Sequence, residues 1–455
     1  RAAPYNIETR FKGNAIFRIR GDTTMTEPTA SDIAQQTKVS GKAWGMLAVT
    51  YFASICAPLC QFKIPPLASW LFPAFHGALD SVTFGTLMSA IALIGVVLAF
   101  PAAFIARRMG LKNVILLSVA CLGVGSVLGG VDANLTLLLV SRLLEGVGIG
   151  LIGVAAPSCV TIWFPERKRG LALGLWATWV PVGSVLAFNT VPMIAGAFGY
   201  QTVFFSLAGV CLVAFVLFCA VYRMPEGATG DMGIEGTFIE SLKHCKNRRI
   251  WILGAVFFLF SMTTIGIMNT YYNTFLETQL GFDAQTASSL SSIIMFISLF
   301  VAPLTGLVSD KLPLGRKYLV GIVMMVLLIP TGFFMFYVGD GATAVMWATI
   351  ILQGIGGGMC GGSLRPMAPM LMRNTAMGAT MAMAIMQFCQ NLGSAIGSPL
   401  FGAVMSTQGW ETASFMLQLP AYALALVLCF FILPRGKNVT SLDDVPADKA
   451  WPKGF

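Results

Sequence analysis

Charge is what this sequence has least of. Only 11% of its 455 residues are charged and 56% are hydrophobic, and the mean hydropathy is +0.77. Soluble domains carry roughly 25% charged and 45–50% apolar residues. So few charges could not solvate the surface of soluble domains of this total length. The composition therefore excludes a soluble protein and predicts an outer surface that faces lipid.

Paired cysteines and catalytic motifs are missing as well. The ten cysteines include no CxxC pair and no Cys/His cluster, and nine of them lie in apolar runs, which predicts small buried residues. No P-loop, GxSxG turn or pair of intramembrane carboxylates is present. We therefore expect no disulfide framework, no metal, no cofactor and no enzymatic activity.

Long apolar runs fill most of the chain. A spanning helix needs roughly 20 mostly apolar residues, and twelve such windows separated by charges, Gly or Pro can be read from the sequence. They are about 43–69, 81–105, 112–131, 135–162, 170–192, 200–222, 250–275, 285–308, 317–338, 342–364, 375–405 and 411–433. The predicted fold is an all-α membrane protein with twelve transmembrane helices.

The longest internal polar stretch divides these helices into two sets of six. We expect an N-terminal bundle at 43–222, a cytoplasmic linker at 223–249 and a C-terminal bundle at 250–433, with cytoplasmic tails at 1–42 and 434–455. The linker contains several Gly residues and a basic cluster. The first residue is Arg, and residues 1–24 before Met25 are expected to be upstream translated sequence. They hold no apolar signal-peptide core, so the first helix should serve as the targeting signal.

Lys and Arg are confined to alternate loops. Cytoplasmic loops are enriched in these residues. With twelve spans and both termini inside, the loops assigned to the outside carry neither, but hold Asp80, Asp132, Glu277, Asp283, Asp340 and Glu411. A wrong helix count would disrupt this alternation, so the charge pattern independently supports both the count and the orientation. Topology thus explains the net charge of +9, and no nucleic-acid partner is expected.

Two pairs of segments repeat between the halves. The segment after the second predicted helix reads Ala103-Phe-Ile-Ala-Arg107-Arg108-Met-Gly110, and the loop after the eighth reads Gly306-Leu-Val-Ser-Asp310-Lys311, then Gly315-Arg316-Lys317. The fourth helix contains Arg142-Leu-Leu-Glu145-Gly146-Val-Gly148, and the tenth contains Gln353-Gly354-Ile-Gly356. These segments resemble the cytoplasmic loop motif and the helix-four motif of the major facilitator superfamily. Arg107 stands where that family usually has Asp, so the cytoplasmic latch should operate mainly through Asp310.

The resemblance implies a fold and a mode of action. The implied fold is two pseudo-symmetric six-helix bundles, and the implied activity is secondary transport by alternating access. It further implies a monomer in a bacterial inner membrane, with both termini cytoplasmic. The segments Gln61-Phe-Lys63-Ile-Pro65-Pro66 and Trp163-Phe-Pro165 through Pro181 are similar, more weakly, to the cyanate, nitroimidazole and nitrate-type anion porters of that family.

Few charged residues fall within the apolar runs. They are Lys63, Arg142, Glu145 and, near the inner boundary, Arg365. Such residues usually face a cavity or a partner because charge is costly in the membrane. Two cations with one acid would make the cavity positive, which favours an anionic substrate. Alternatively, Lys63 snorkels to the outer interface, Arg142 and Glu145 pair with each other on one helix face, and Arg365 contacts structural groups or lipid headgroups.

Polar and aromatic side chains on other helices are candidates for binding the substrate. The predicted substrate-binding residues are Lys63, Arg142, Trp176, Trp179, Asn269, Tyr272, Gln387 and Asn391. The alternatives are hydrogen bonds between helices for the amides and interface anchoring for the aromatics. Glu145 is the predicted coupling group because it is the one acid in the predicted spans. The predicted cytoplasmic gate comprises Arg107, Arg108, Gly110, Gly306, Asp310, Lys311, Gly315 and Arg316.

The sequence therefore predicts a secondary carrier of a small organic or inorganic anion, with protons or a counter-anion as the coupled ion. The rival hypothesis is an exporter of apolar or cationic drug-like compounds. The sign of the charge in the substrate cavity would discriminate the two.

Overall fold

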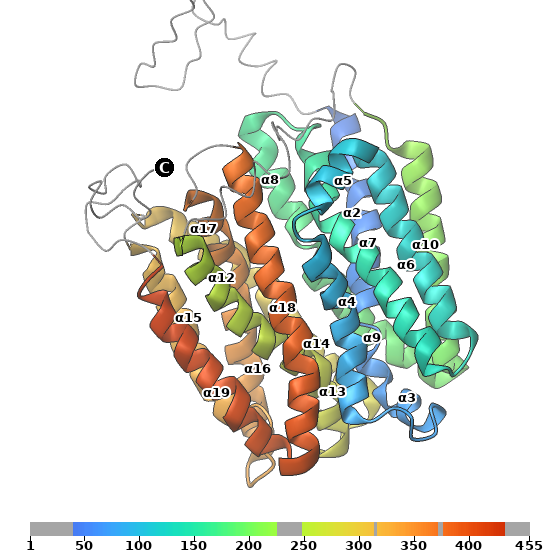
Figure 1. Ribbon diagram of the computed structural model, residues 1–455, viewed down its shortest axis with the longest axis vertical. Helices are drawn as coiled ribbons and strands as arrows, with labels where there is room; N and C mark the ends of the chain where they lie inside the picture. The colour runs from blue at the N-terminus through green and yellow to red at the C-terminus, as the bar shows by residue number, and fades with distance from the viewer. Residues whose placement is uncertain (1–39, 225–247, 314–315, 372–375, 433–455) are drawn as a thin grey trace, which may run out of the picture.

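A computed structural model of the protein describes residues 40–224, 248–313, 316–371 and 376–432. These residues are almost entirely helical (Figure 1). The predicted tails, except for residues 40–42 at the end of the first, and most of the predicted linker lie outside the described residues.

The first half of the chain forms one group of helices. Its long helices are α2 (Gly41–Gln61), α4 (Ser81–Leu98), α6 (Leu111–Val131), α7 (Leu135–Thr161), α9 (Trp179–Phe198) and α10 (Tyr200–Val221). Shorter segments continue or precede them: η1 (Pro65–Leu67), α3 (Ala68–Ala74), α5 (Ala102–Met109) and α8 (Glu166–Ala177).

The second half forms a matching group. It consists of α12 (Arg248–Ser261), η3 (Met262–Met268), α13 (Asn269–Thr278), α14 (Ala284–Lys311), α15 (Tyr318–Phe334), α16 (Ala342–Met359), η5 (Cys360–Leu364), α17 (Arg365–Met370), α18 (Ala376–Gln408) and α19 (Trp410–Cys429). Figure 1 shows the two groups side by side, with α18 of the second half next to α4 of the first.

Ten helical segments of the described chain are long and apolar enough to cross a membrane. The shorter apolar helix α15 and the 33-residue α18 bring the number of crossings to twelve. The prediction of an all-α, twelve-helix membrane fold is confirmed.

Several predicted helices are interrupted. The window predicted at 43–69 contains α2, a three-residue break at 62–64 and then η1, because Pro65 and Pro66 lack the backbone N–H that a continuing helix needs. The second window breaks before α5 near Pro101, and the fifth breaks at Thr178 between α8 and α9. In the second half, η3 and η5 are π-helical turns within otherwise continuous spans. The breaks and π turns change the direction of side chains at mid-span.

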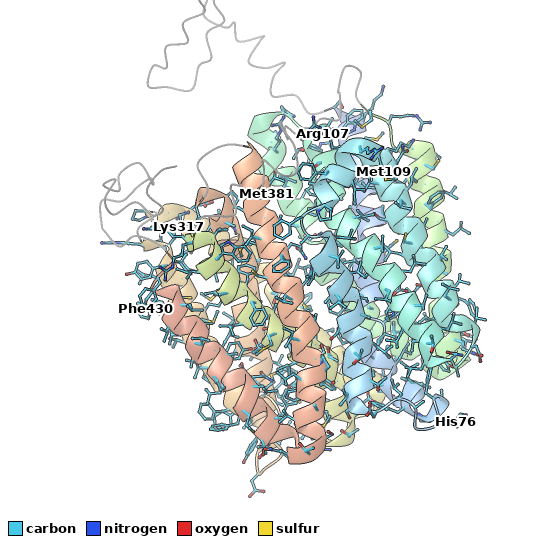
Figure 2. The ribbon with its side chains drawn as sticks, in the orientation of Figure 1. His76, Arg107, Met109, Lys317, Met381 and Phe430 are labelled. Carbon is cyan, nitrogen blue, oxygen red and sulfur yellow. The ribbon has the colours of Figure 1, made fainter. Side chains whose placement is uncertain are left out.

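The two ends of the bundle differ in charge. Figure 2 shows Arg107, Met109 and Lys317 toward one end and His76 at the other. We call the first the basic end. The loops at the opposite end, 75–80, 132–134, 279–283 and 335–341, contain no Lys or Arg but hold acidic residues, so we call it the acidic end.

Side-chain hydrogen bonds join the halves near the acidic end. Tyr271 of α13 donates its hydroxyl to the backbone oxygen of Ser81 at 2.6 Å. Asn189 of α9 donates to the hydroxyl of Ser292 at 3.1 Å and accepts from Ser289 of α14 at 2.9 Å. We call this set, Ser81, Asn189, Tyr271, Ser289 and Ser292, the acidic-end seal.

Hydrophobic packing follows the same pattern. One core at the acidic end takes Phe84 and Phe188 from the first half together with Tyr272 and Phe401 from the second. The two other large cores belong to one half each, apart from the Phe100–Phe104 region, which packs on the second half. The halves are thus fastened to each other mainly at the acidic end.

Candidate functional site

The break in the first span delivers Lys63 into the interior of the first half. Its Nζ lies 2.7 Å from Glu145 Oε1 of α7 and donates to Ser126 of α6 at 2.8 Å. Ser126 in turn donates to the same carboxylate oxygen at 2.9 Å. Lys63 is therefore not at the interface where a snorkelling side chain would lie.

Arg142 completes this group, and its predicted contact with Glu145 is confirmed. Its Nη2 pairs with Glu145 Oε2, one helical turn along α7, and its Nη1 donates to the backbone oxygen of Cys60 at 3.0 Å. The ring of Phe204 lies 4.2 Å from Lys63 Nζ and gives the ammonium a cation–π contact. We call Lys63, Arg142 and Glu145 the charged triad.

The charged triad is fully enclosed. All three side chains have 0% exposed surface, so two cations share one carboxylate away from water. The net charge of the triad is +1. Desolvation of so many charges is costly, and structural buried pairs are often replaceable by apolar residues without loss of stability. The triad is therefore a better candidate for function than for stability.

The second half has a neutral counterpart of Glu145. The repeated segments align Glu145-Gly146-Val-Gly148 with Gln353-Gly354-Ile-Gly356, so Gln353 of α16 occupies the matching position. Gln353 donates to Thr264 at 2.7 Å and accepts from Thr331 at 3.2 Å. In the second half, hydrogen bonds between neutral side chains thus occupy the position that Glu145 has in the first half. The helical fold alone therefore does not require a charged residue at this position.

A third membrane-embedded cation lies in the second half. Arg365, the first residue of α17, donates from Nη2 to Gln387 Oε1 at 3.0 Å and to Gln390 Oε1 at 2.8 Å. Gln387 donates onward to Asn391 Oδ1 at 3.2 Å. All four side chains are partly exposed. We call Arg365, Gln387, Gln390 and Asn391 the arginine–amide cluster. It includes two of the predicted substrate-binding residues.

The arginine–amide cluster borders the first half. A Cβ atom added to Gly95 of α4 would lie 2.3 Å from Asn391 Nδ2, so the amide packs directly on that glycine. Towards the acidic end, Ser89 of α4 donates to the backbone oxygen of Ala395 at 2.7 Å. The cluster therefore lies at the seam between the halves, next to the region that the seal closes.

The remaining predicted substrate-binding residues lie elsewhere. Trp176 and Trp179 stack on each other with ring centroids 5.5 Å apart, and Trp176 donates to Ser54 of α2. Asn269 is buried, and Tyr272 packs on Phe275 and Phe336 in the core at the acidic end. The structure therefore separates the predicted residues into the triad, the tryptophan pair, the arginine–amide cluster and the Asn269–Tyr272 segment.

The predicted gate residues lie at the basic end. Gly110 ends α5 with φ of 83°, and Arg107 and Arg108 are exposed one turn before it. Gly306 is not in a loop as predicted, because α14 continues to Lys311, so Gly306, Asp310 and Lys311 belong to its last turns. Asp310 lies 3.9 Å from the ammonium of Lys317. Arg316 is partly exposed, and Gly315 lies outside the described residues.

Two polar residues with a part in these contacts were not predicted. Ser126 gave no signal of its own, whereas Gln390 is a candidate from the sequence because it shares a helix face with Gln387 and Asn391. Glu277 was assigned to a loop, whereas it lies in the last turn of α13 and accepts from Asn273. Glu145 is therefore not the only acid within the helices of the described membrane-spanning segments. Glu277 is a second one, and it lies next to the acidic end. Among the described residues, no group of His, Cys, Asp or Glu could hold a metal ion.

Comparison with known proteins identifies a family. A family model described as "Major Facilitator Superfamily" matches residues 50–383. The chain is 23% identical over 373 residues to the lysosomal dipeptide transporter MFSD1 of Mus musculus, covering 75% of this chain and 76% of that one. It is 22% identical over 300 residues to a protein of Cupriavidus necator named "Probable sulfoacetate transporter SauU", covering 61% and 66%.

Two further matches are a sequence relative with a different name and a solved structure. The multidrug resistance protein MdtG of Escherichia fergusonii is 24% identical over 320 residues, which cover 69% of this chain and 75% of that protein. A crystal structure of a bacterial homologue of the human lysosomal transporter Spinster, in an inward-facing and unoccupied conformation, has a TM-score of 0.66 at 16% identity. It covers 87% of this chain and 96% of that one.

Proposed function

The chain belongs to the Major Facilitator Superfamily, and from that premise we propose that it carries small organic anions bearing a carboxylate. In this proposal the carrier works by alternating access, in which the halves part at one end and then at the other. The basic end faces the cytoplasm of a bacterium, as the positive-inside rule favours. The acidic-end seal then closes the route to the outside.

The balance of membrane-embedded charge carries this proposal. Away from the two ends of the bundle, the described residues include the cations Lys63, Arg142 and Arg365 but only one acid, Glu145, since Glu277 lies next to the acidic end. Charges at this depth are costly unless they are compensated. An anionic solute would supply compensation that the protein itself does not. A cationic drug would add to the imbalance, so this observation favours the anion over the rival hypothesis.

The names of two relatives support a solute that bears a carboxylate. Dipeptides and sulfoacetate, named for these relatives, both carry this group, although a dipeptide also carries an ammonium group and has no net charge. The name of the third relative points to drug-like compounds, for which the described spans offer no excess of acidic residues. We therefore narrow the predicted small anion to an organic carboxylate.

Glu145 is proposed as the group that couples transport to protons. Protonation would remove the one negative charge between Lys63 and Arg142 and raise the net charge of the triad from +1 to +2. Since an arriving anion offsets positive charge, a proton and an anion favour each other's binding. That reciprocity is what a proton symporter needs.

The test is uptake into proteoliposomes that contain the purified full-length chain. The probes are radiolabelled alanylalanine, its C-terminal amide, and sulfoacetate, each with and without an inward proton gradient. We expect uptake of at least one of the two acids to exceed that of the amide by tenfold or more, and to increase with the gradient. The amide has the same backbone and side chains as alanylalanine but a neutral amide in place of the carboxylate, so its net charge is +1 instead of zero. Protein-free liposomes set the background.

Uptake of neither acid, or uptake of the amide equal to that of alanylalanine, would overturn the proposal. Export of cationic dyes from the same proteoliposomes would favour the drug exporter.

A further inference from the structure

We propose that the arginine–amide cluster is the subsite that takes the carboxylate of the transported solute. This inference rests on the proposed function and names the residues that perform it. It assigns the decisive cation to Arg365 of the second half rather than to Lys63 or Arg142. The reasons lie in the direction, the missing counter-ion and the surroundings of Arg365.

The guanidinium of Arg365 is bound by side chains of the neighbouring helix α18. Arg365 lies five residues before the end of α17, which is about 8 Å from that end. Its partners Gln387 and Gln390 lie 11 and 14 residues after the start of α18, well inside that helix. A snorkelling arginine would instead bind water and headgroups. The bonds to α18 therefore favour a contact inside the protein over a headgroup contact.

The helix is modified where it presents Arg365. The π-helical turn η5 ends at Leu364, directly before this residue. A π turn adds one residue, which rotates the following side chains by about 100° relative to an uninterrupted α-helix. The turn therefore aims Arg365 at α18. Such turns occur frequently at functional sites.

Arg365 has no carboxylate partner among the described residues. Lys63 and Arg142 pair with Glu145, and Lys317 pairs with Asp310, but no pair among the described residues joins Arg365 to an acid. The guanidinium instead meets two neutral amide oxygens, and its buried Nε has no hydrogen-bond partner. By contrast, the two cations of the triad already share an acid. Arg365 is thus the membrane-embedded cation that most lacks an anion.

The surrounding amides suit an oxyanion. A guanidinium offers a planar fork of N–H donors that matches a carboxylate. Glutamine and asparagine add NH₂ donors next to it, and turning one amide would exchange its oxygen for a donor. Ser261 of α12 donates to the backbone oxygen of Gln390 at 2.6 Å and holds this part of α18 in place. The cluster is therefore anchored in its backbone but adjustable in its side chains.

The position of the cluster suits alternating access. Asn391 touches Gly95 of the opposite half, and Phe388 of the same helix contacts Phe100 with ring centroids 5.6 Å apart. A solute bound to Arg365 would therefore contact both halves. Towards the acidic end the halves are bonded together immediately beyond it, through Ser89 and Ala395. The bond of Ser89 thus closes the seam on the acidic side of the cluster.

The decisive variant is Gln390→Glu. Glutamate has the shape of glutamine, so this change places a carboxylate beside the guanidinium, in the position of the proposed ligand. We expect uptake of alanylalanine or sulfoacetate, whichever the wild-type protein takes up, to fall at least tenfold. The melting temperature of the unliganded protein should stay the same or rise, because Arg365 gains an internal counter-ion. Arg365→Lys, which keeps the charge but loses the fork, should also lose at least tenfold in uptake.

The matched control is Lys42→Ala, which removes an exposed cation at the start of α2 and should leave uptake within twofold of wild type. The inference is overturned if Gln390→Glu and Arg365→Lys both keep wild-type uptake and the preference for alanylalanine over its amide. That result would leave the proposed function standing. Failure of the wild-type protein to take up either acid would overturn both together.

Discussion

At the scale of single residues, the charged triad is the feature in which charge is most concentrated. Glu145 is contacted by Lys63 on one oxygen and by Arg142 on the other, with all three side chains enclosed. Removing one partner of a buried ion pair typically costs about 3–5 kcal/mol because the other charge is left uncompensated. The three residues should therefore respond very differently to neutralisation.

We predict that Glu145→Gln is the most damaging single neutralisation in the triad. It leaves two buried cations without an acid and raises the net charge to +2, so its melting temperature in detergent should fall well below that of Lys63→Met. The latter leaves Arg142 and Glu145 as a neutral pair. The double variant Lys63→Met/Glu145→Gln has the wild-type net charge of +1 and should recover much of the loss. Equal melting temperatures for the two single variants would contradict this electrostatic account.

The double variant also tests coupling. It has the net charge of the wild type but no titratable acid in the triad, so uptake driven by a proton gradient should disappear while exchange of internal for external anion continues. Gradient-driven uptake at the wild-type level would rule out Glu145 as the coupling group.

The sequence could place Lys63, Arg142 and Glu145 in the membrane, because charged residues in apolar runs are conspicuous. The i, i+3 spacing also predicted the contact of Arg142 with Glu145. It could not predict that Lys63 turns into the first half, because this depends on where the helix breaks before Pro65. Nor could it show that Arg365 lacks an acid, since that requires knowing every neighbour in space.

At the scale of secondary-structure elements, the crossing of α18 over α12 and η3 depends on glycine. A Cβ atom at Gly393 would lie 2.2 Å from the backbone oxygen of Phe258, and one at Gly397 would lie 2.4 Å from that of Met262. Backbone atoms cannot move aside as a side chain can. Small residues at such crossings let helices approach closely in membranes. The same contact fixes α18 next to Ser261 and therefore positions Gln390.

We predict that Gly393→Ala destabilises the protein by about 1–3 kcal/mol, the usual cost of overpacking. The matched control is Gly209→Ala in α10, where an added Cβ meets nothing within 4 Å. That change should be neutral or slightly stabilising, because alanine favours the helix over glycine. Thermal unfolding of both variants in the same detergent checks the difference. A loss at Gly209 as large as that at Gly393 would show that helix crossing is not the cause.

Hydropathy predicted the elements better than their interruptions. The windows matched α6, α7, α10 and α19 to within a few residues, because length and apolarity alone decide a continuous span. The π turns η3 and η5 left no such signal, since they change the hydrogen-bond pattern without changing composition. These turns nevertheless decide where Arg365 and the α13 residues point.

At the scale of the whole molecule, the proposed alternating access requires two conformations, and the structure is one of them. The repeat in the sequence predicts two similar halves, but it cannot predict at which end they touch, because both states share every helix. Here the acidic-end seal joins α9 to α14 through Asn189 and α13 to α4 through Tyr271. Hydrogen bonds of this kind exist in one state and are absent when that end opens.

We predict that Asn189→Ala shifts the population towards the state that is open at the acidic end. The change removes two side-chain bonds between the halves, each worth about 0.5–1.5 kcal/mol, so the ratio of the two states should change by about tenfold. Distances between spin labels on Ala133 and Thr343, which lie near the acidic end of opposite halves, should show a larger long-distance fraction. Thr190→Ala is the control, because Thr190 bonds only to Leu186 of its own helix among the described contacts. Identical distance distributions for both variants would mean that the apolar core at the acidic end, and not these hydrogen bonds, holds the halves together.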